Sequence, residues 1–160
     1  MLSLFKDIYC INLTSREDRW HQVQKSFSQI GIKEKVQRFP AVNPRGYEFD
    51  PKFDTKVGPY HIVPNAGCLG SHRAIIKKAK EEGMEKVLVF EDDVSFLHED
   101  ITSVRHSAED LPNTWGLFYL GATVEKKMSM VSNFLFRTNC AKATHAVVYH
   151  HTVYDDILSK

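Results

Sequence analysis

The sequence predicts an α/β layered fold with a mainly parallel sheet. Almost continuous apolar runs over 8–13 and 87–90 are typical of strands buried on both faces of a parallel sheet. Between them, apolar residues recur at helical spacing over 20–30 and 68–79. A chain of 160 residues, 42% of them hydrophobic and 26% charged, can bury its own core, which favours one globular domain and excludes a disordered or collagen-like chain.

The first predicted unit is a strand, a short loop and a helix. The apolar run over 8–13 predicts the strand, which is expected to end near Asn12. Ser15, followed three residues later by Asp18, has the pattern of a capping box, which predicts that a helix begins there. The helical spacing stops at Gly31, a residue that commonly follows the end of a helix.

A weaker strand, a long loop and a second helix are expected next. Residues 36–42 have a strand pattern that is broken by Pro40. The stretch 43–64 is rich in proline and glycine, and a long segment of this kind inside a domain is usually functional, so we expect a binding loop that is mobile without ligand and ordered with it. From Ala66, a helix is expected to pack its apolar face on the sheet and to end at Gly83.

The second half of the chain continues the alternation of strands and helices. Residues 87–90 have the clearest pattern of a buried strand. A short helix over 101–111 follows, and then a strand over 117–120 that Gly121 is expected to end. A last strand over 146–149 precedes a short helix at the C-terminus.

Three adjacent acids, Glu91, Asp92 and Asp93, follow the strand over 87–90 directly. Carboxylates this close repel one another unless a cation or a basic group lies among them. While the chain stays extended, Glu91 and Asp93 point to one side and Asp92 to the other. Ligands of open α/β sheets bind at the carboxyl ends of the strands, and oxygen ligands suit Mg²⁺ or Mn²⁺. The residues alone leave open a metal site or a solvated acidic turn.

Other polar residues give weaker indications. Arg16 and Arg19 follow the first strand and could hold a phosphate or nucleotide, although arginines in a solvated first helical turn explain them as well. His72 lies on the apolar side of its helix, where a packed, hydrogen-bonded histidine is favoured over a ligand contact. Gly67 and Gly70 flank the predicted helix start, where free N–H groups could receive an anion.

The charge and the cysteine content limit the classes of partner and the cellular compartment that we expect. Lys and Arg number 21 and Asp and Glu 20, a net charge of +1, so no basic field favours nucleic acid. The three cysteines are far apart in the sequence, and the first residues lack the features of a signal peptide, so we expect a reducing, cytoplasmic environment. No run approaches the ~18 apolar residues of a transmembrane helix, which leaves peripheral membrane contact open.

Five blocks of the sequence, taken in order, resemble glycosyltransferase family 25. The blocks are 9–13 with Arg16, Asp18, Arg19 and Trp20; 38–42; 67–72; 87–94; and 144–148. This family includes bacterial lipooligosaccharide galactosyltransferases, which act in lipopolysaccharide biosynthesis, and collagen hydroxylysine galactosyltransferases. The resemblance implies a GT-A-like fold, that is, a Rossmann-related three-layer sandwich with a mainly parallel sheet.

The resemblance also implies an activity. It implies a metal-dependent transfer of a sugar, with galactose favoured, from a UDP-sugar to a hydroxyl of a glycan or protein, assisted by Mn²⁺ or Mg²⁺. Because the collagen and lipooligosaccharide members form β-linkages from α-linked donors, it implies inversion through one in-line attack by the acceptor hydroxyl. The carboxylate base that would deprotonate this hydroxyl is not identified.

Roles for individual residues follow from the same resemblance. Glu91, Asp92 and Asp93 occupy the place of an Asp-x-Asp-like motif, in which the last acid ligates the metal and the first contacts a metal-bound water or the ribose. Metal binding is therefore expected at Asp93 and Glu91. Contacts with the nucleotide sugar are expected at Asn12, Leu13, Arg16, Ala41, Val42, Ser71, His72 and Asp92.

The extent of the chain leaves alternatives open. The family domain usually continues for several dozen residues past its threonine-bearing strand, here 144–148, whereas this sequence stops at Lys160. We therefore expect a single domain over 1–160, with the C-terminal acceptor-side portion in question, and donor binding with weak transfer, seen mostly as slow donor hydrolysis. The alternatives are a truncated or non-catalytic relative that binds nucleotide sugar, and a metal-dependent phosphoesterase, for which no nucleophilic Asp with the expected partners is present.

Overall fold

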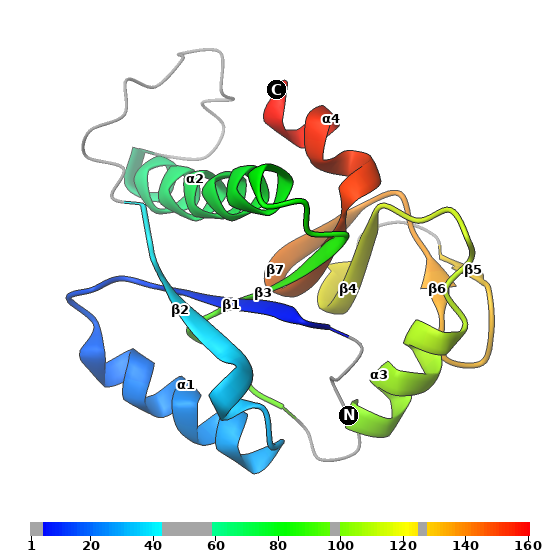
Figure 1. Cartoon of the computed structure of the whole chain (residues 1–160), viewed down its shortest axis with the longest axis horizontal. Coiled ribbons are helices and arrows are strands. Elements are labelled where there is room, and N and C mark those ends of the chain that lie inside the picture. Colours follow the sequence, from blue (N-terminus) through cyan, green and yellow to red (C-terminus); the bar gives the residue numbers. More distant parts are fainter. Residues whose placement is uncertain (1–4, 43–58, 97–99, 125–127) are drawn as a thin grey trace.

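Figure 1 shows the computed structural model of the chain, which describes residues 5–42, 59–96, 100–124 and 128–160. The elements in chain order are β1 (Asp7–Asn12), α1 (Glu17–Gln29), the 3₁₀ turn η2 (Lys33–Lys35), β2 (Val36–Pro40), α2 (Pro59–Glu81), β3 (Lys86–Glu91), α3 (Asp100–Glu109), β4 (Leu117–Val124), β5 (Ser129–Met130), β6 (Phe136–Arg137), β7 (Ala141–His150), the 3₁₀ turn η4 (His151–Val153) and α4 (Tyr154–Leu158). The order of strands and helices is that of an α/β protein.

The described residues form a central five-stranded sheet with the strand order β2-β1-β3-β7-β4. β1 pairs in parallel with both β2 and β3, whereas β7 pairs antiparallel with β3 and with β4. All strands except β7 therefore run in one direction, and the predicted α/β fold with a mainly parallel sheet is confirmed. β2 is an edge strand, and Pro40 is tolerated at its end because an edge strand leaves N–H positions unpaired.

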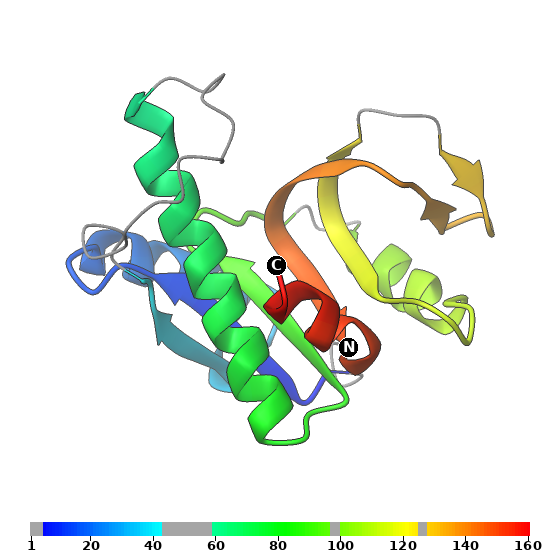
Figure 2. The same ribbon diagram turned by 90° about the horizontal axis from the view of Figure 1, so that it is seen from above.

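Helices cover both faces of the sheet and make three layers (Figures 1 and 2). On one face, α1 contributes the buried residues Val23 and Phe27, which pack with alternate strand residues such as Phe90. On the other face, α2 contributes Ile75 and Ile76, which pack with the intervening strand residues and with α4. Because β1 and β3 are covered on both sides, their sequences are apolar at successive positions rather than at every second one.

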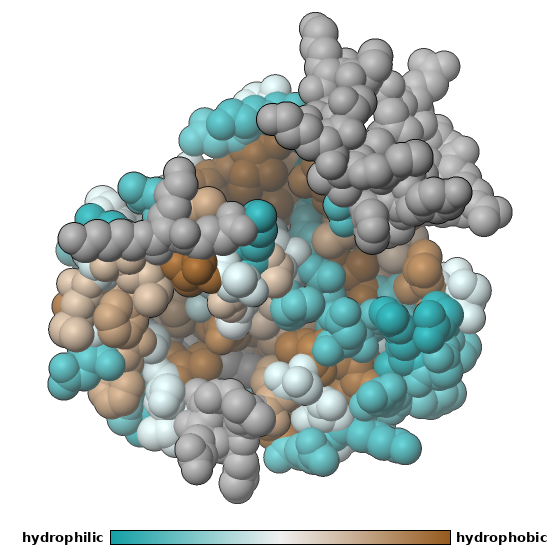
Figure 3. Space-filling model, turned by 180° about the vertical axis from the view of Figure 1, so that it is seen from behind, coloured by the Kyte–Doolittle hydropathy of each residue, from teal (hydrophilic) through white to brown (hydrophobic). Residues whose placement is uncertain are grey.

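The hairpin of β5 and β6 lies beside β4 and α3, away from the main sheet (Figure 2). A cavity of about 810 Å³ lies between these elements, and Val104 and Leu120 are among its lining residues. Met128, Phe134 and Phe136, which also line it, are each 46–47% exposed. In Figure 3, which shows the molecule from behind, hydrophobic residues accordingly gather on the side of β5 and β6.

The start of the first helix differs from the prediction. α1 begins at Glu17 with Arg16 as the preceding residue, and no side chain caps it. The capping box of Ser15 and Asp18 was wrong because Asp18 accepts two hydrogen bonds from the Arg16 guanidinium, at 2.9 and 2.7 Å, instead of reaching back to the backbone. Asp18 lies at the surface, and this contact lowers its pKa to about 2.

The second helix begins earlier than predicted. α2 starts at Pro59, so the last residues of the predicted loop over 43–64 are helical, and residues 43–58 lie outside the described part. A proline at the first helical position loses only an N–H that has no intrahelical acceptor, so it does not break the helix. Gly67 and Gly70 consequently lie inside α2 rather than at its start, and the prediction of an anion site there was wrong because their turn is no longer the first.

The two strands at the far edge of the sheet are longer than predicted. β4 continues through Gly121, which lies at a register shift in its pairing with β7 instead of ending the strand. β7 begins at Ala141, five residues before the apolar stretch that indicated it. The β5–β6 hairpin was not predicted, because each of its strands has only two residues. Within the described residues, no helix combines the length and the apolar character that crossing a membrane requires.

Candidate functional site

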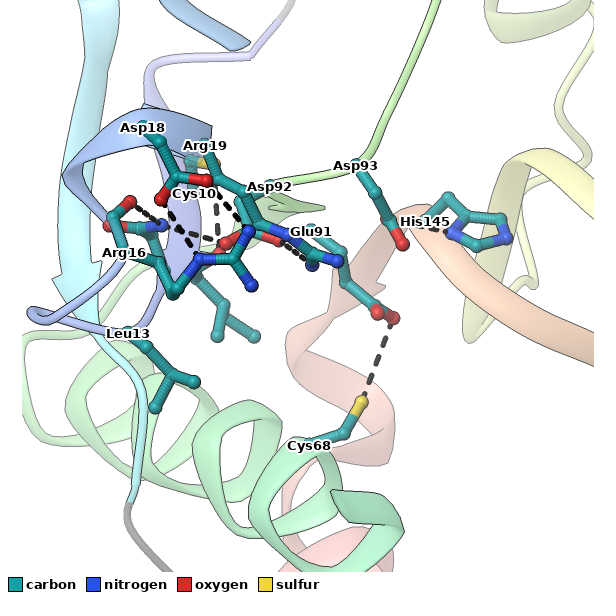
Figure 4. Close-up of polar contacts among 12 residues, drawn as sticks. Cys10, Leu13, Arg16, Asp18, Arg19, Cys68, Glu91, Asp92, Asp93 and His145 are labelled. Carbon is teal, nitrogen blue, oxygen red and sulfur yellow. Dashed lines mark hydrogen bonds and ion pairs between the residues drawn. The ribbon is translucent and has the colours of Figure 1, made fainter. Parts of the chain in front are cut away.

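The three acids at the end of β3 diverge (Figure 4): Glu91 is the last residue of the strand, and Asp92 and Asp93 lie in the turn that follows, which Val94 N closes by donating to Glu91 O at 3.2 Å. Asp92 turns toward the start of α1, where it contacts Asn12 and Arg19. Glu91 and Asp93 turn the other way, toward β7, and a ligand oxygen of each lies within 4.8 Å of the other and of a nitrogen of His145. The expectation that Glu91 and Asp93 share one side is confirmed.

Asp92 is held by polar groups of the protein. Its Oδ2 accepts a hydrogen bond from Asn12 Nδ2 at 2.7 Å, and its Oδ1 lies 3.0 Å from the Arg19 guanidinium. Only 12% of its side chain is exposed. This pairing neutralises one of the three adjacent carboxylates and fixes the end of β3 against α1.

Asn12 connects three elements at the carboxyl edge of the sheet. It is 1% exposed, and its Nδ2 donates both to Asp92 and to the backbone oxygen of Arg16. Its Oδ1 accepts from Nε and Nη2 of Arg38, which also contacts Glu17 at 2.6 Å. Since both amide hydrogens and both lone pairs of Asn12 are in use, its side chain holds the edge of the sheet together.

Glu91 lies in the most enclosed part of the site. Its Oε1 accepts hydrogen bonds from the hydroxyl of Thr144 and, at 3.6 Å, from the thiol of Cys68, and His72 Nε2 lies 3.6 Å away. The His72 imidazole is the largest cause that lowers the pKa of Glu91, and the Thr144 hydroxyl adds to it, so the pKa falls to about 2 although burial opposes the shift. Glu91 is therefore a carboxylate at neutral pH.

An irregularity in β7 brings two further side chains to the acids. Gly121 pairs with Ala146 and Thr123 with Lys142, so residues 143–145 of β7 stand opposite Ala122 alone. Within this bulge Ala143 has a φ of 67°, a backbone conformation that residues other than glycine rarely adopt. Bulges re-aim side chains beside functional sites. Here the bulge carries Thr144, which contacts Glu91, and His145, which contacts Asp93.

The open part of the site contains Asp93 and His145. His145 Nδ1 lies 3.2 Å from Asp93 Oδ1, and about half of each side chain is exposed. A cavity of about 300 Å³ adjoins them, lined otherwise by mostly apolar residues such as Val94, Phe96 and Leu120. Two carboxylates and an imidazole that converge at an exposed point suit a divalent cation such as Mn²⁺, with room for water or a substrate oxygen.

The residues expected to contact the donor fall into two groups. Leu13 is 44% exposed, and Arg16 is held at the surface by Asp18; Figure 4 shows both well apart from Asp93 and His145. This position fits the alternative in which Arg16 is a solvated arginine beside the first helical turn. Donor contacts of Leu13 and Arg16 stay a prediction, as do those of Asn12 and Asp92.

The second group joins β2 to α2. Ala41 N donates to the backbone oxygen of Asn12 at 3.0 Å. Val42 N donates to Ser71 Oγ at 2.8 Å, and the buried Ser71 hydroxyl in turn donates to the backbone oxygen of Gly67. These contacts fix the chain that leaves β2 against α2. Their role beside a nucleotide stays a prediction.

His72 is buried at 4% exposure, and its Nδ1 lies 3.0 Å from the Tyr149 hydroxyl, so the expectation of a packed, hydrogen-bonded histidine is confirmed. Two residues of the site were not predicted from the sequence, namely His145 and Cys68. His145 lies in a block that resembles the family, but only the bulge in β7 directs it to Asp93. Cys68 could be found from its spacing of four residues from His72, which places both on one side of α2.

A comparison with protein-family models matches residues 5–157 to glycosyltransferase family 25, described as a lipopolysaccharide biosynthesis protein. Among curated proteins, a glycosyltransferase 25 family member of Aedes aegypti is 33% identical over 128 residues, 71% of this chain. Procollagen galactosyltransferase 1-A of Xenopus laevis is 27% identical over 132 residues, 73% of this chain.

A third relative, named inactive glycosyltransferase 25 family member 3, of Homo sapiens, is 28% identical over 129 residues, 73% of this chain. In each case the chain spans only a small part of the relative, namely 21% of the Aedes aegypti and Xenopus laevis proteins and 22% of the human one. The family match over residues 5–157 contains the strands and helices that build the site.

Proposed function

The chain belongs to glycosyltransferase family 25, and from this premise we propose that it transfers a sugar from a UDP-sugar, with UDP-galactose as the first candidate, to a hydroxyl group of a glycan or a protein. A divalent cation, Mn²⁺ or Mg²⁺, assists the transfer. The galactosyltransferase name of the Xenopus laevis relative supports galactose as the sugar and a collagen-type hydroxyl as one acceptor to test. The sequence spacing of the three cysteines supports a cytoplasmic location.

One observation supports the proposal above all: Glu91 at the end of β3, Asp93 in the turn after it and His145 from β7 converge, and the two exposed members, Asp93 and His145, line a cavity. A cation bound there would supply positive charge to the diphosphate that leaves the sugar. Glu91 and Asp93 would hold the cation through oxygen and His145 through nitrogen. The Asn12–Asp92 pair keeps the third carboxylate away from this point and holds the end of β3 in place.

The geometry is compatible with an in-line reaction in which the sugar lies between two sides of the site. The nucleotide would approach from the carboxyl ends of β1 and β3, where open α/β sheets bind ligands. The acceptor hydroxyl would attack from the opposite side of the anomeric carbon, so the product would have inverted configuration. The cavity beside Asp93 and His145, with its apolar lining, offers room for part of a sugar ring or its substituent.

A donor-consumption assay tests the proposal. The chain is incubated with UDP-galactose and Mn²⁺, with and without galactoside and hydroxylysine-peptide acceptors, and both UDP and the glycosylated product are measured. We expect UDP release that requires Mn²⁺, stops with a chelator and falls at least tenfold in Asp93→Asn, whereas Asp156→Asn, on α4, keeps it. UDP release that is independent of the cation and of Asp93 would contradict the proposal.

A second candidate function is donor binding without efficient transfer. It is favoured by the relative that is named inactive, which is 28% identical to this chain over 129 residues. The same assay separates the two functions. Slow UDP release without any glycosylated acceptor, together with cation-dependent UDP binding, supports the second candidate, whereas acceptor-dependent product supports the first.

A further inference from the structure

A second group of metal-ligating atoms lies behind the exposed acids. Cys68 and His72 are four residues apart on α2, so their side chains lie on the same side of the helix, facing the end of β3. Cys68 Sγ and His72 Nε2 each lie 3.6 Å from Glu91 Oε1, and the three atoms are within 4.8 Å of one another. This cluster, Cys68–His72–Glu91, combines sulfur, nitrogen and oxygen ligands.

The buried ring of His72 points an unsatisfied nitrogen into the cluster. Its side chain is 5% exposed, and its Nδ1 is engaged with the Tyr149 hydroxyl at 3.0 Å. Nε2 has no hydrogen-bond partner among the described residues, and the 3.6 Å to Glu91 is too long for a hydrogen bond. A buried polar atom without a partner is destabilising, so a ligand for Nε2 is expected.

The distances from Glu91 Oε1 to the other two ligand atoms match the coordination shell of zinc. Zinc–ligand distances of about 2.3 Å to sulfur and 2.0–2.1 Å to nitrogen or oxygen give tetrahedral edges of about 3.5 Å for sulfur to oxygen and about 3.3 Å for nitrogen to oxygen. Both measured separations are 3.6 Å. We propose that Cys68 Sγ, His72 Nε2 and Glu91 form a site for a thiophilic divalent cation such as Zn²⁺, separate in chemistry from the exposed group of Asp93 and His145.

Neighbouring groups are placed to support this coordination. When a cation binds, the thiol proton of Cys68 leaves to solvent and the thiolate takes its place in the shell. When the cation binds, His72 takes the tautomer in which Nδ1–H donates to the Tyr149 oxygen 3.0 Å away, so that the Nε2 lone pair faces the cation. The Thr144 hydroxyl continues to donate to Glu91 and orients the carboxylate. Water or another oxygen completes the tetrahedron.

Glu91 belongs to both groups of ligands, which has a functional consequence that rests on the proposed function. A Zn²⁺ ion that occupies Glu91 competes with Mn²⁺ bound through Glu91, Asp93 and His145. Zn²⁺ would therefore oppose Mn²⁺-dependent donor binding.

The site itself is tested without any nucleotide, by titrating the full chain with Co²⁺ and following the thiolate-to-cobalt charge-transfer absorption, and by calorimetric titration with Zn²⁺. We expect a charge-transfer band in the wild type. In Cys68→Ser the band should be lost, and the affinity for Zn²⁺ should be at least tenfold weaker than in the wild type. The matched control is Cys140→Ser, which changes a cysteine outside the cluster and should keep both signals.

His72→Gln provides a second variant, and thermal melting of each apo variant shows whether it is folded. Loss of Zn²⁺ affinity in folded Cys68→Ser supports the site even if His72→Gln fails to fold. An absent charge-transfer band in the wild type, a band that survives Cys68→Ser, or a band lost in Cys140→Ser would overturn the proposal. Since UDP and sugar are left out, these results do not depend on whether the chain transfers a sugar.

Discussion

His145 Nδ1 lies 3.2 Å from Asp93 Oδ1, although 52 residues separate them in the sequence. The turn after β3 supplies the acid, and the antiparallel β7 supplies the histidine from a bulge in which Ala143 has a positive φ. The parallel strands β1 and β3 thus provide the buried end of the site, and an irregular antiparallel strand completes its open side. Strain in β7 and the chemistry of the site are coupled through this contact.

Substitution of Ala143 tests that coupling. A β-branched residue at a φ of 67° is strained, so Ala143→Val should lower the free energy of unfolding by about 1–3 kcal/mol and weaken Mn²⁺ binding by displacing His145. Ala143→Gly should keep both properties, because glycine adopts this φ readily. The control Ala122→Val lies on the facing strand β4, and both quantities should stay near wild type. Denaturant unfolding measures the free energy of unfolding, and calorimetry measures the affinity for Mn²⁺. If Ala143→Val is destabilised but keeps full Mn²⁺ affinity, the strained backbone at Ala143 is not coupled to the metal site.

His145 is expected to be a metal ligand in its own right. His145→Gln should weaken Mn²⁺ affinity by at least about tenfold, since even the outer-shell partners of metal ligands are worth 10–100-fold. His21→Gln, which changes an exposed histidine of α1, should leave the affinity unchanged. Electron paramagnetic resonance of Mn²⁺ reports the free ion directly. Equal affinities for the two variants would remove His145 from the ligand set.

Asn12 should matter more for stability than for chemistry. Asn12→Ala removes a fully hydrogen-bonded side chain that is 1% exposed. It leaves Asp92 Oδ2 without its Asn12 donor and Arg38 without its Asn12 acceptor, although Asp92 keeps Arg19 and Arg38 keeps Glu17, so the free energy of unfolding should fall by about 2–4 kcal/mol. Asn113→Ala, at an exposed position, should change it by less than about 0.5 kcal/mol. Urea unfolding compares the two variants. A loss for Asn12→Ala as small as for Asn113→Ala would show that the hydrogen bonds of Asn12 contribute little.

The carboxylate of Glu91 should make stability depend on pH in the acid range. The His72 imidazole lowers the folded-state pKa of Glu91 from 4.5 to about 2. A lowered folded-state pKa means that the ionised group stabilises the fold above the unfolded-state pKa, and that this contribution is lost as the pH falls toward the folded-state pKa. The unfolding free energy of the wild type minus that of Glu91→Gln should thus be constant above pH 4.5 and decline from there toward pH 2.

Unfolding measured in urea at a series of pH values gives this difference. The difference between the wild type and Asn113→Ala, which changes no titratable group, serves as the control and should not vary with pH. A Glu91 difference that stays constant or grows as the pH falls through this range would contradict the lowered pKa.

The sequence predicts the parts of the fold that depend on local pattern. The apolar runs in β1 and β3 indicate strands covered on both sides. Glu91 and Asp93 share one side as expected from an extended chain, but the strand ends at Glu91, and a turn rather than strand alternation directs Asp93. Positions that depend on long-range pairing are not predictable in this way. Asn12 meets Arg38 only because β1 and β2 pair in parallel. His145 reaches Asp93 only because the pairing of β4 with β7 shifts register and forms the bulge. The helix start at Pro59 was missed because Pro59 and Pro64 were counted with the loop over 43–64, whereas both lie within α2.

The central claim is that Asp93, together with Glu91 and His145, holds a divalent cation that binds the diphosphate of a nucleotide sugar. The most direct test is calorimetric titration of UDP in the presence and absence of Mn²⁺, with the wild type, with Asp93→Asn, which keeps the size of the side chain and removes its charge, and with Asp156→Asn as the matched control. We predict Mn²⁺-dependent UDP binding in the wild type and in Asp156→Asn, weakened by about tenfold or more in Asp93→Asn. UDP binding that is equally tight in all three proteins, or that does not need Mn²⁺, would contradict the claim.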